Sequence, residues 1–283
     1  ISRNKQCILV FLIIGLPIYT TSLSVALQIG FINTVPFMQP LKELLILIAL
    51  GLGVTELNRR IRLQTIDYAI LAYFFITLLY VLLPIGQYDF IDKVIAFKSS
   101  SFFTLIYCAG RLFDPARIYI SKYFHYILAV FIAAAGVLLF EIINDQHFQT
   151  LTGYADFNFY YFNQEATGNY GLSWTFETST GLRRFASFFA NPLEFAASTL
   201  LTLAILAGLY TTDDNKIKVD TLGIIAIIAT QFSIFFALSR SSLASYFIMI
   251  FVYALITKKK LILNIIYAGF IAIAIYFTFF MLV

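Results

Sequence analysis

Residues 181–194 read G-L-R-R-F-A-S-F-F-A-N-P-L-E, and this stretch decides how the rest of the chain is interpreted. It closes a long polar segment, and an apolar run of about 20 residues begins directly behind it. Asn191 followed by Pro192 is typical of a helix N-cap and the first helical residue. The stretch also carries two adjacent arginines, Arg183 and Arg184. We therefore expect a polar loop that holds two cations beside the start of a membrane helix.

The composition is that of a membrane protein. Hydrophobic residues make up 60% of the 283 residues and charged residues only 12%, whereas soluble domains carry about 25% charged residues. The net charge of +4 is small and dispersed, which argues against nucleic acid as a partner. Cys7 and Cys108 are expected to be free thiols on the cytoplasmic side. With two histidines and no Cys/His cluster, we expect neither a metal nor a cofactor.

Apolar runs predict about nine membrane-spanning helices, because about 30 Å of hydrocarbon needs about 20 residues at 1.5 Å each. The runs cover roughly 8–30, 36–54, 66–86, 91–110, 123–143, 192–210, 220–238, 241–257 and 261–283. We therefore predict an all-α polytopic membrane protein whose residues 1–283 form a single transmembrane domain. The apolar run that reaches Val283 predicts that this domain continues beyond it. Residues 144–191 are expected to form one long external loop that contains partial helices.

Basic residues recur in every second connection between the predicted helices. They are Arg3, Lys5, Arg59, Arg60, Arg62, Arg111, Arg117, Lys122, Lys216, Lys218, Lys258, Lys259 and Lys260. By the positive-inside rule these segments face the cytoplasm. The pattern predicts a multi-pass protein with a cytoplasmic N-terminus.

The remaining cations lie on the outer side or in the outer halves of predicted helices. They are Lys42, Lys93, Lys98, Arg183, Arg184 and Arg240. A cation at the centre of a bilayer costs about 2.5–3.5 kcal/mol, so a cation in such a place usually has a function. Guanidinium groups also bind phosphate oxygens through paired N–H bonds. We predict an anionic ligand on the outer face, with the three arginines as catalytic candidates and with Lys42 and Lys98 binding substrate. Snorkelling to the interface is the alternative for the paired arginines and for Lys98.

Arg240 lies in the polar stretch L-S-R-S-S at residues 238–242, which is expected to form a tight turn between two apolar helices. The hydroxyl groups of Ser239 and Ser241 can hydrogen-bond a phosphate or the freed backbone ends. We assign both serines to substrate binding. An ordinary solvated turn is the alternative.

Outward carboxylates are needed if the reaction removes a proton from a sugar hydroxyl. The candidates are Glu141, Asp145, Asp156, Glu165, Glu177 and Glu194. Glu194 is the catalytic candidate because it lies in the first turn of a predicted helix and close to the arginines, although helix capping would also explain it. Asn191 is assigned to substrate binding. His147, the single external histidine, is expected at the surface.

The pattern between residues 183 and 241 resembles the O-antigen polymerase and ligase superfamily, which includes capsule and exopolysaccharide polymerases. The shared features are Arg183/Arg184-x-x-Ser187-x-Phe189-x-Asn191-Pro192, an apolar helix, a short cytoplasmic loop, another helix, and then Leu238-Ser239-Arg240-Ser241. The resemblance implies a metal-independent glycosyltransferase with a GT-C-like helical bundle in the bacterial cytoplasmic (inner) membrane. Such an enzyme moves a glycan from an undecaprenyl-diphosphate donor to an acceptor sugar on the outer face. By this analogy Arg183 or Arg184, together with Arg240, holds the diphosphate and stabilises it as a leaving group.

One departure from the family concerns its ligases, which carry a further external loop with a functional histidine. The chain ends at Val283 before such a loop, so we favour a polymerase over a ligase. The second hypothesis is a transporter or flippase for an anionic lipid-linked or small solute, and the third is a non-catalytic membrane assembly or sensor protein. The expected partners are the lipid bilayer and an undecaprenyl-diphosphate-linked oligosaccharide, and a chain-length regulator is left open.

Overall fold

A computed structural model gives the fold, and it describes residues 10–55, 63–112, 120–212, 214 and 216–281. Within these residues the regular structure is helical, with two isolated β-bridges and no strands. The prediction of an all-α protein is therefore confirmed. Several residues named above lie outside the described ones, namely Arg3, Lys5, Cys7, Arg59, Arg60, Arg62, Arg117 and Val283. The predictions that rest on them stay predictions.

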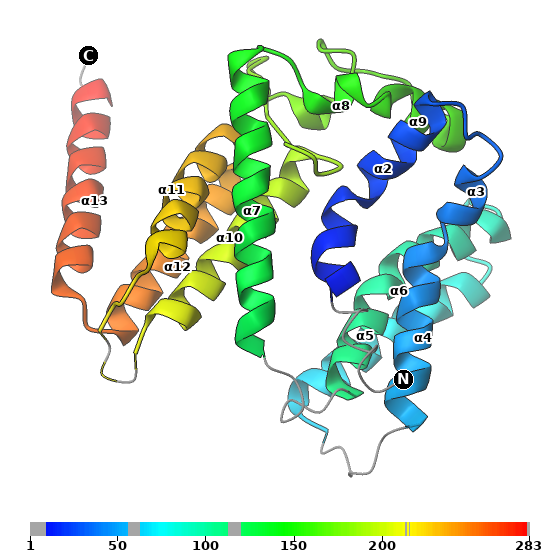
Figure 1. The fold of residues 1–283 in the computed structure, drawn as a ribbon, viewed down its shortest axis with the longest axis horizontal. Coiled ribbons are helices and arrows are strands. Elements are labelled where there is room, and N and C mark those ends of the chain that lie inside the picture. The colour runs from blue at the N-terminus through cyan, green and yellow to red at the C-terminus, as the bar shows by residue number, and fades with distance from the viewer. Residues whose placement is uncertain (1–9, 56–62, 113–119, 213, 215, 282–283) are drawn as a thin grey trace. The chain divides into compact units, whose positions relative to one another are not determined.

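The helices coincide with the predicted apolar runs (Figure 1). They are η1 (Phe11–Gly15), α2 (Leu16–Gln28), α3 (Val35–Met38), α4 (Leu41–Thr55), α5 (Thr65–Leu82), α6 (Phe90–Leu112), α7 (Ile120–Ile143), α10 (Pro192–Tyr210), α11 (Thr221–Phe236), α12 (Arg240–Ile256) and α13 (Lys260–Met281). Five stretches are long and apolar enough to cross a membrane: Phe11–Gln28, Val35–Thr55, Thr65–Leu82, Ser121–Ile143 and Pro192–Tyr210. The chain is therefore an all-α membrane protein, while nine spans and a GT-C-like bundle stay predictions.

Contacts divide the chain into two compact units, which are described separately. The first unit comprises Ile1–Leu12 and Asn33–Ile120, and the second comprises Ile13–Ile32 and Ser121–Val283. The expectation of a single transmembrane domain stays a prediction.

In the first unit, α6 packs against both α4 and α5. The buried small side chains Ala49 and Ala109 lie in the hydrophobic cluster of this unit. Arg111 was expected in a connection but belongs to the last turn of α6. Its Nε and Nη2 atoms donate to the two carboxylate oxygens of Asp67 at 2.9 and 2.8 Å. This bidentate pair links the last turn of α6 to the first turn of α5.

The core of the second unit is built from α7, α10, α11 and α12. Large apolar side chains such as Leu138 and Phe195 are fully buried there, and the rings of Phe131 and Phe195 stack with centroids 5.9 Å apart. α13 packs against α12. The polar segment that follows α7 packs against this core.

Three short helices follow α7 at its C-terminal end (Figure 1): α8 (Phe148–Leu151), α9 (Tyr154–Phe162) and η3 (Trp174–Phe176). α9 packs against α2, and the Tyr161 hydroxyl donates to the Ile32 carbonyl at 3.1 Å. These contacts hold part of the segment at residues 144–191 against α2 and the residues that follow α2. Its external location stays a prediction.

The connection between α11 and α12 comprises residues 237–239 and so begins and ends earlier than the turn predicted at residues 238–242. α11 ends at Phe236, and the chain reverses through Leu238, which adopts a left-handed φ of +46°. Ser239 is the N-cap of α12, and its hydroxyl accepts from the Ser242 amide at 3.5 Å. Arg240 and Ser241 are therefore the first residues of α12 and not members of a turn, because the N-cap starts the helix one residue before Arg240.

Candidate anion site

Residues 181–191 form a loop that is anchored by two phenylalanines. Phe185 and Phe189 are buried and pack into the core of the second unit beside Phe195 and Phe236. Burial of each aromatic side chain contributes roughly 2 kcal/mol. The loop backbone that carries Arg183 and Arg184 is therefore held against the helices.

A backbone hydrogen bond brings this loop beside the end of α11. The Phe185 amide donates to the Phe236 carbonyl at 3.3 Å. Arg184 is one residue before this contact, and Arg240 is four residues beyond Phe236, at the first position of α12. Two arginines that are far apart in the sequence thus lie on adjoining backbone segments.

Arg183 and Arg184 differ in their surroundings although they are neighbours. Arg183 forms an ion pair with Asp145, with 2.7 Å between its Nη1 and the Asp145 Oδ1, and it also donates to the Asp145 carbonyl. Its guanidinium lies 4.4 Å from the centroid of the Tyr170 ring. The charge of Arg183 is therefore compensated, and this side chain ties the loop to the residues that follow α7.

Arg184 and Arg240 carry uncompensated charges. Among the described residues, neither guanidinium forms a side-chain hydrogen bond or an ion pair, and the Nε of Arg184 is buried without a partner. Arg184 is half-buried, and Arg240 is exposed. A partly buried cation without a partner is costly, so an anion that pairs with it would be bound favourably.

A buried carboxylate holds the loop from the side of α7. Glu141 is fully buried, its Oε1 accepts from the Phe148 amide and its Oε2 accepts from the Ser187 amide, both at 2.9 Å. Ser187 has a left-handed φ of +54°, which is uncommon outside glycine. Its hydroxyl donates to the Ala134 carbonyl at 2.7 Å. Glu141 therefore stabilises a backbone conformation that the loop would not adopt alone.

Gln149 of α8 also binds the backbone of this loop. Its side-chain amide donates to the carbonyls of Ser187 and Phe189 at 2.6 and 2.5 Å, and the residue is fully buried. The Thr21 hydroxyl of α2 donates to the Phe188 carbonyl at 2.7 Å. Side chains of α8 and α2 thus hold the consecutive carbonyls of residues 187–189, while Glu141 of α7 accepts from the Ser187 amide. We refer to Glu141 and Gln149 together as the clasp.

His147 is buried, so the expectation of a surface histidine was wrong. Its exposed fraction is 2%, and the rings of Tyr170, Phe176 and Phe185 surround it at centroid distances of 5.3–5.6 Å. Both ring nitrogens lack a hydrogen-bond partner among the described residues. Burial and, to a smaller extent, the positive charge of Arg183 lower the pKa of His147 from 6.5 to about 4, while Asp145 opposes the shift. His147 is therefore neutral at pH 7.

The burial of His147 predicts that the free energy of unfolding decreases in acid. An imidazole with a pKa of 6.5 in the unfolded chain and about 4 in the folded chain binds more protons when unfolded between these values. Its contribution is complete above pH 6.5, and the free energy of unfolding falls by roughly 3 kcal/mol as the pH drops toward 4. We expect His147→Leu to raise the melting temperature in detergent at pH 7 and to weaken its decline below pH 6.5. The exposed His125→Leu is the control, and an unchanged pH profile for His147→Leu would refute the assignment.

The predicted binding residues at the helix starts have capping contacts. The Asn191 side chain accepts from the amides of Leu193 and Glu194 at 3.0 and 2.9 Å, and its amide group donates to the Glu194 carboxylate at 3.0 Å. Ser239 is buried and caps α12, whereas Ser241 is exposed. The roles of these four residues in substrate binding or catalysis stay predictions.

Lys42 and Lys98 belong to the first unit, whereas the three arginines belong to the second. The contacts described for the arginines therefore do not include these lysines. Lys98 pairs with Glu43, with 3.4 Å between the Nζ and Oε1 atoms, and the Lys42 ammonium lies 5.1 Å from the centroid of the Phe102 ring. These contacts join α4 to α6. Convergence of all six outward cations on one ligand stays a prediction.

The sequence predicted the arginines as site residues, but it did not predict the clasp. Glu141 is one of several outward carboxylates in the sequence, and no sequence pattern distinguishes Gln149. The available signal was a glutamate near the end of an apolar helix, where a charged side chain needs a partner.

Comparisons with known proteins do not extend this description. No family model matches the chain, and no curated protein and no solved structure matches it. Within the described residues, no group of three or more His, Cys, Asp or Glu side chains could hold a metal ion. The chemistry of the site is therefore inferred from the residues of this chain.

Proposed function

We propose that the chain is a membrane glycosyltransferase that polymerises undecaprenyl-diphosphate-linked glycan units on the outer face of the bacterial cytoplasmic membrane. The observation that supports it is the pair of uncompensated cations, Arg184 and Arg240, on backbone segments joined by the Phe185–Phe236 hydrogen bond. A lipid diphosphate offers two linked anionic groups to such a pair.

In the proposed reaction the hydroxyl oxygen of the acceptor sugar attacks the anomeric carbon of the donor. The bond from this carbon to the diphosphate oxygen breaks, and the lipid diphosphate leaves with the bonding electrons. Arg184 and Arg240 stabilise the charge that develops on the leaving group. Glu194 is the candidate base that takes the hydroxyl proton.

The test uses the full-length protein in a strain that lacks the gene, with membrane levels and surface polysaccharide measured on blots. Arg240→Ala should leave single repeat units on the lipid at normal protein levels, and Arg240→Lys should restore part of the polymer because it keeps the charge but not the paired N–H bonds. Lys260→Ala removes an exposed cation at the start of α13 and is the control. Full-length polymer from Arg240→Ala would overturn the role of Arg240, and lipid-linked units trapped on the inner face would favour a flippase.

A further inference from the structure

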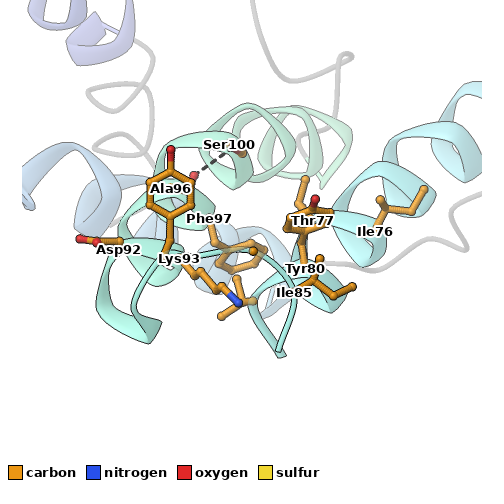
Figure 2. Close-up of a pocket in the computed structure, with 12 residues that line it drawn as sticks. Ile76, Thr77, Tyr80, Ile85, Asp92, Lys93, Ala96, Phe97 and Ser100 are labelled. Carbon is orange, nitrogen blue, oxygen red and sulfur yellow. Dashed lines mark hydrogen bonds between the residues drawn. The ribbon is translucent and has the colours of Figure 1, made fainter. Parts of the chain in front are cut away.

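A cavity of about 560 Å³ lies in the first unit, between the last turns of α5 and the first turns of α6 (Figure 2). Its size is within the range of small-molecule sites, about 300–1,000 Å³. Its wall is apolar along Ile76, Val81, Ile85 and Phe97. The arginines and the clasp belong to the other unit, so this cavity is distinct from the candidate anion site.

The cavity lies beside the end of α5, and we expect this end of the helix to lie near a membrane surface. α5 is long and apolar enough to cross a bilayer, and its 18 residues span about 27 Å, close to the thickness of the hydrocarbon core. The cavity wall includes Thr77 and Tyr80 near the end of this helix and Tyr88 in the connection to α6. Tyrosines are enriched where hydrocarbon meets the lipid head groups. An occupant would therefore meet both apolar and polar surroundings.

Lys93 supplies a positive charge at this cavity. Its ammonium donates to the Leu83 carbonyl at 2.9 Å, a partner without net charge. A lysine has three N–H donors, so two remain for a ligand. Asp92 also lines the cavity, but Figure 2 shows its carboxylate and the Lys93 ammonium pointing in different directions. Among the described residues Lys93 forms no ion pair, so its charge favours an anionic head group.

We propose that this cavity binds an anionic phospholipid, with an acyl chain against the apolar wall and the head-group phosphate on Lys93. A zwitterionic lipid offers the same chain and phosphate but adds a cation that Lys93 repels. One basic residue near an anionic lipid surface changes binding about fivefold. The site is independent of the proposed transferase, since it uses none of its residues.

The test counts bound lipids on the intact purified protein by native mass spectrometry. Phosphatidylglycerol and phosphatidylcholine with identical acyl chains are the probes. We expect the wild type to retain phosphatidylglycerol about fivefold more strongly, Lys93→Gln to lose this preference, and Ala96→Trp to lower the retention of both lipids by filling the cavity. Lys218→Gln, an exposed cation in the other unit, and Val94→Trp, an exposed residue outside the cavity wall, are the matched controls.

The results can support or contradict the proposed lipid site. Equal retention of the two lipids by the wild type, or an unchanged preference in Lys93→Gln, would overturn the anionic site. Unchanged retention in a folded Ala96→Trp protein would show that lipids bind elsewhere. If Ala96→Trp does not fold, the comparison of Lys93→Gln with Lys218→Gln still decides the proposal.

Discussion

Replacing Arg184 with alanine is expected to reduce polymer formation about 100- to 1,000-fold while leaving the melting temperature nearly unchanged. Its guanidinium forms no side-chain hydrogen bond or ion pair with the described residues, so its removal breaks neither kind of interaction there. If Arg184 stabilises a departing diphosphate, the whole loss falls on the reaction. Arg184→Lys should recover part of the rate, because the charge remains but the planar pair of N–H donors does not. The measurement is the initial rate of transfer by the purified full-length protein, with the melting temperature recorded in parallel.

Replacing Arg183 is expected to have a different effect from replacing Arg184, because the charge of Arg183 is already paired. Its ion pair with Asp145 and its contact with the Tyr170 ring predict that Arg183→Ala lowers the melting temperature and reduces the rate less than Arg184→Ala does. Lys218→Ala, which removes an exposed cation from the connection between α10 and α11, controls for the loss of one positive charge. A larger loss of rate in Arg183→Ala than in Arg184→Ala would reverse the assignment of the two arginines.

The apolar runs were sufficient to predict the longer helices among the described residues. The run at 192–210 matches α10 at both ends, because Asn191 and Pro192 mark its start and the polar residues after Tyr210 mark its end. Length and hydropathy are local properties, so no knowledge of packing is needed to recognise such a helix. The start of α12 was misplaced because the capping role of Ser239 depends on its backbone conformation.

The site could be predicted only as a set of charged residues. Nothing local to Arg183 indicates that Asp145 lies beside it, since 38 residues separate the two. The different surroundings of Arg183 and Arg184 therefore follow from tertiary structure alone. The burial of His147 could not be predicted either, because it depends on the rings of Tyr170, Phe176 and Phe185.

Removing the carboxylate of Glu141 is expected to release the loop at 181–191. Glu141→Ala leaves the amides of Phe148 and Ser187 without their buried acceptor, and it opens a cavity beside α7. The loss of the acceptor for these two donors costs about 2–6 kcal/mol. The left-handed conformation of Ser187 then loses one of the three hydrogen bonds that hold this residue, and the segment that carries Arg184 is held less firmly. We expect polymer formation to fall at least tenfold in parallel with the melting temperature.

Hydrogen exchange separates this positioning role from a direct part in the reaction. In Glu141→Ala, peptides that cover residues 181–191 should exchange faster, whereas in Arg184→Ala they should exchange at the wild-type rate. Glu141→Gln keeps the shape of the side chain, but its amide group faces one of the two N–H donors, so one bond is lost and the effect should be intermediate. Glu165→Ala removes an exposed carboxylate from the same polar segment and is the matched control. Unchanged exchange at residues 181–191 in Glu141→Ala would contradict the clasp, because a loop that stays ordered without this carboxylate does not depend on it.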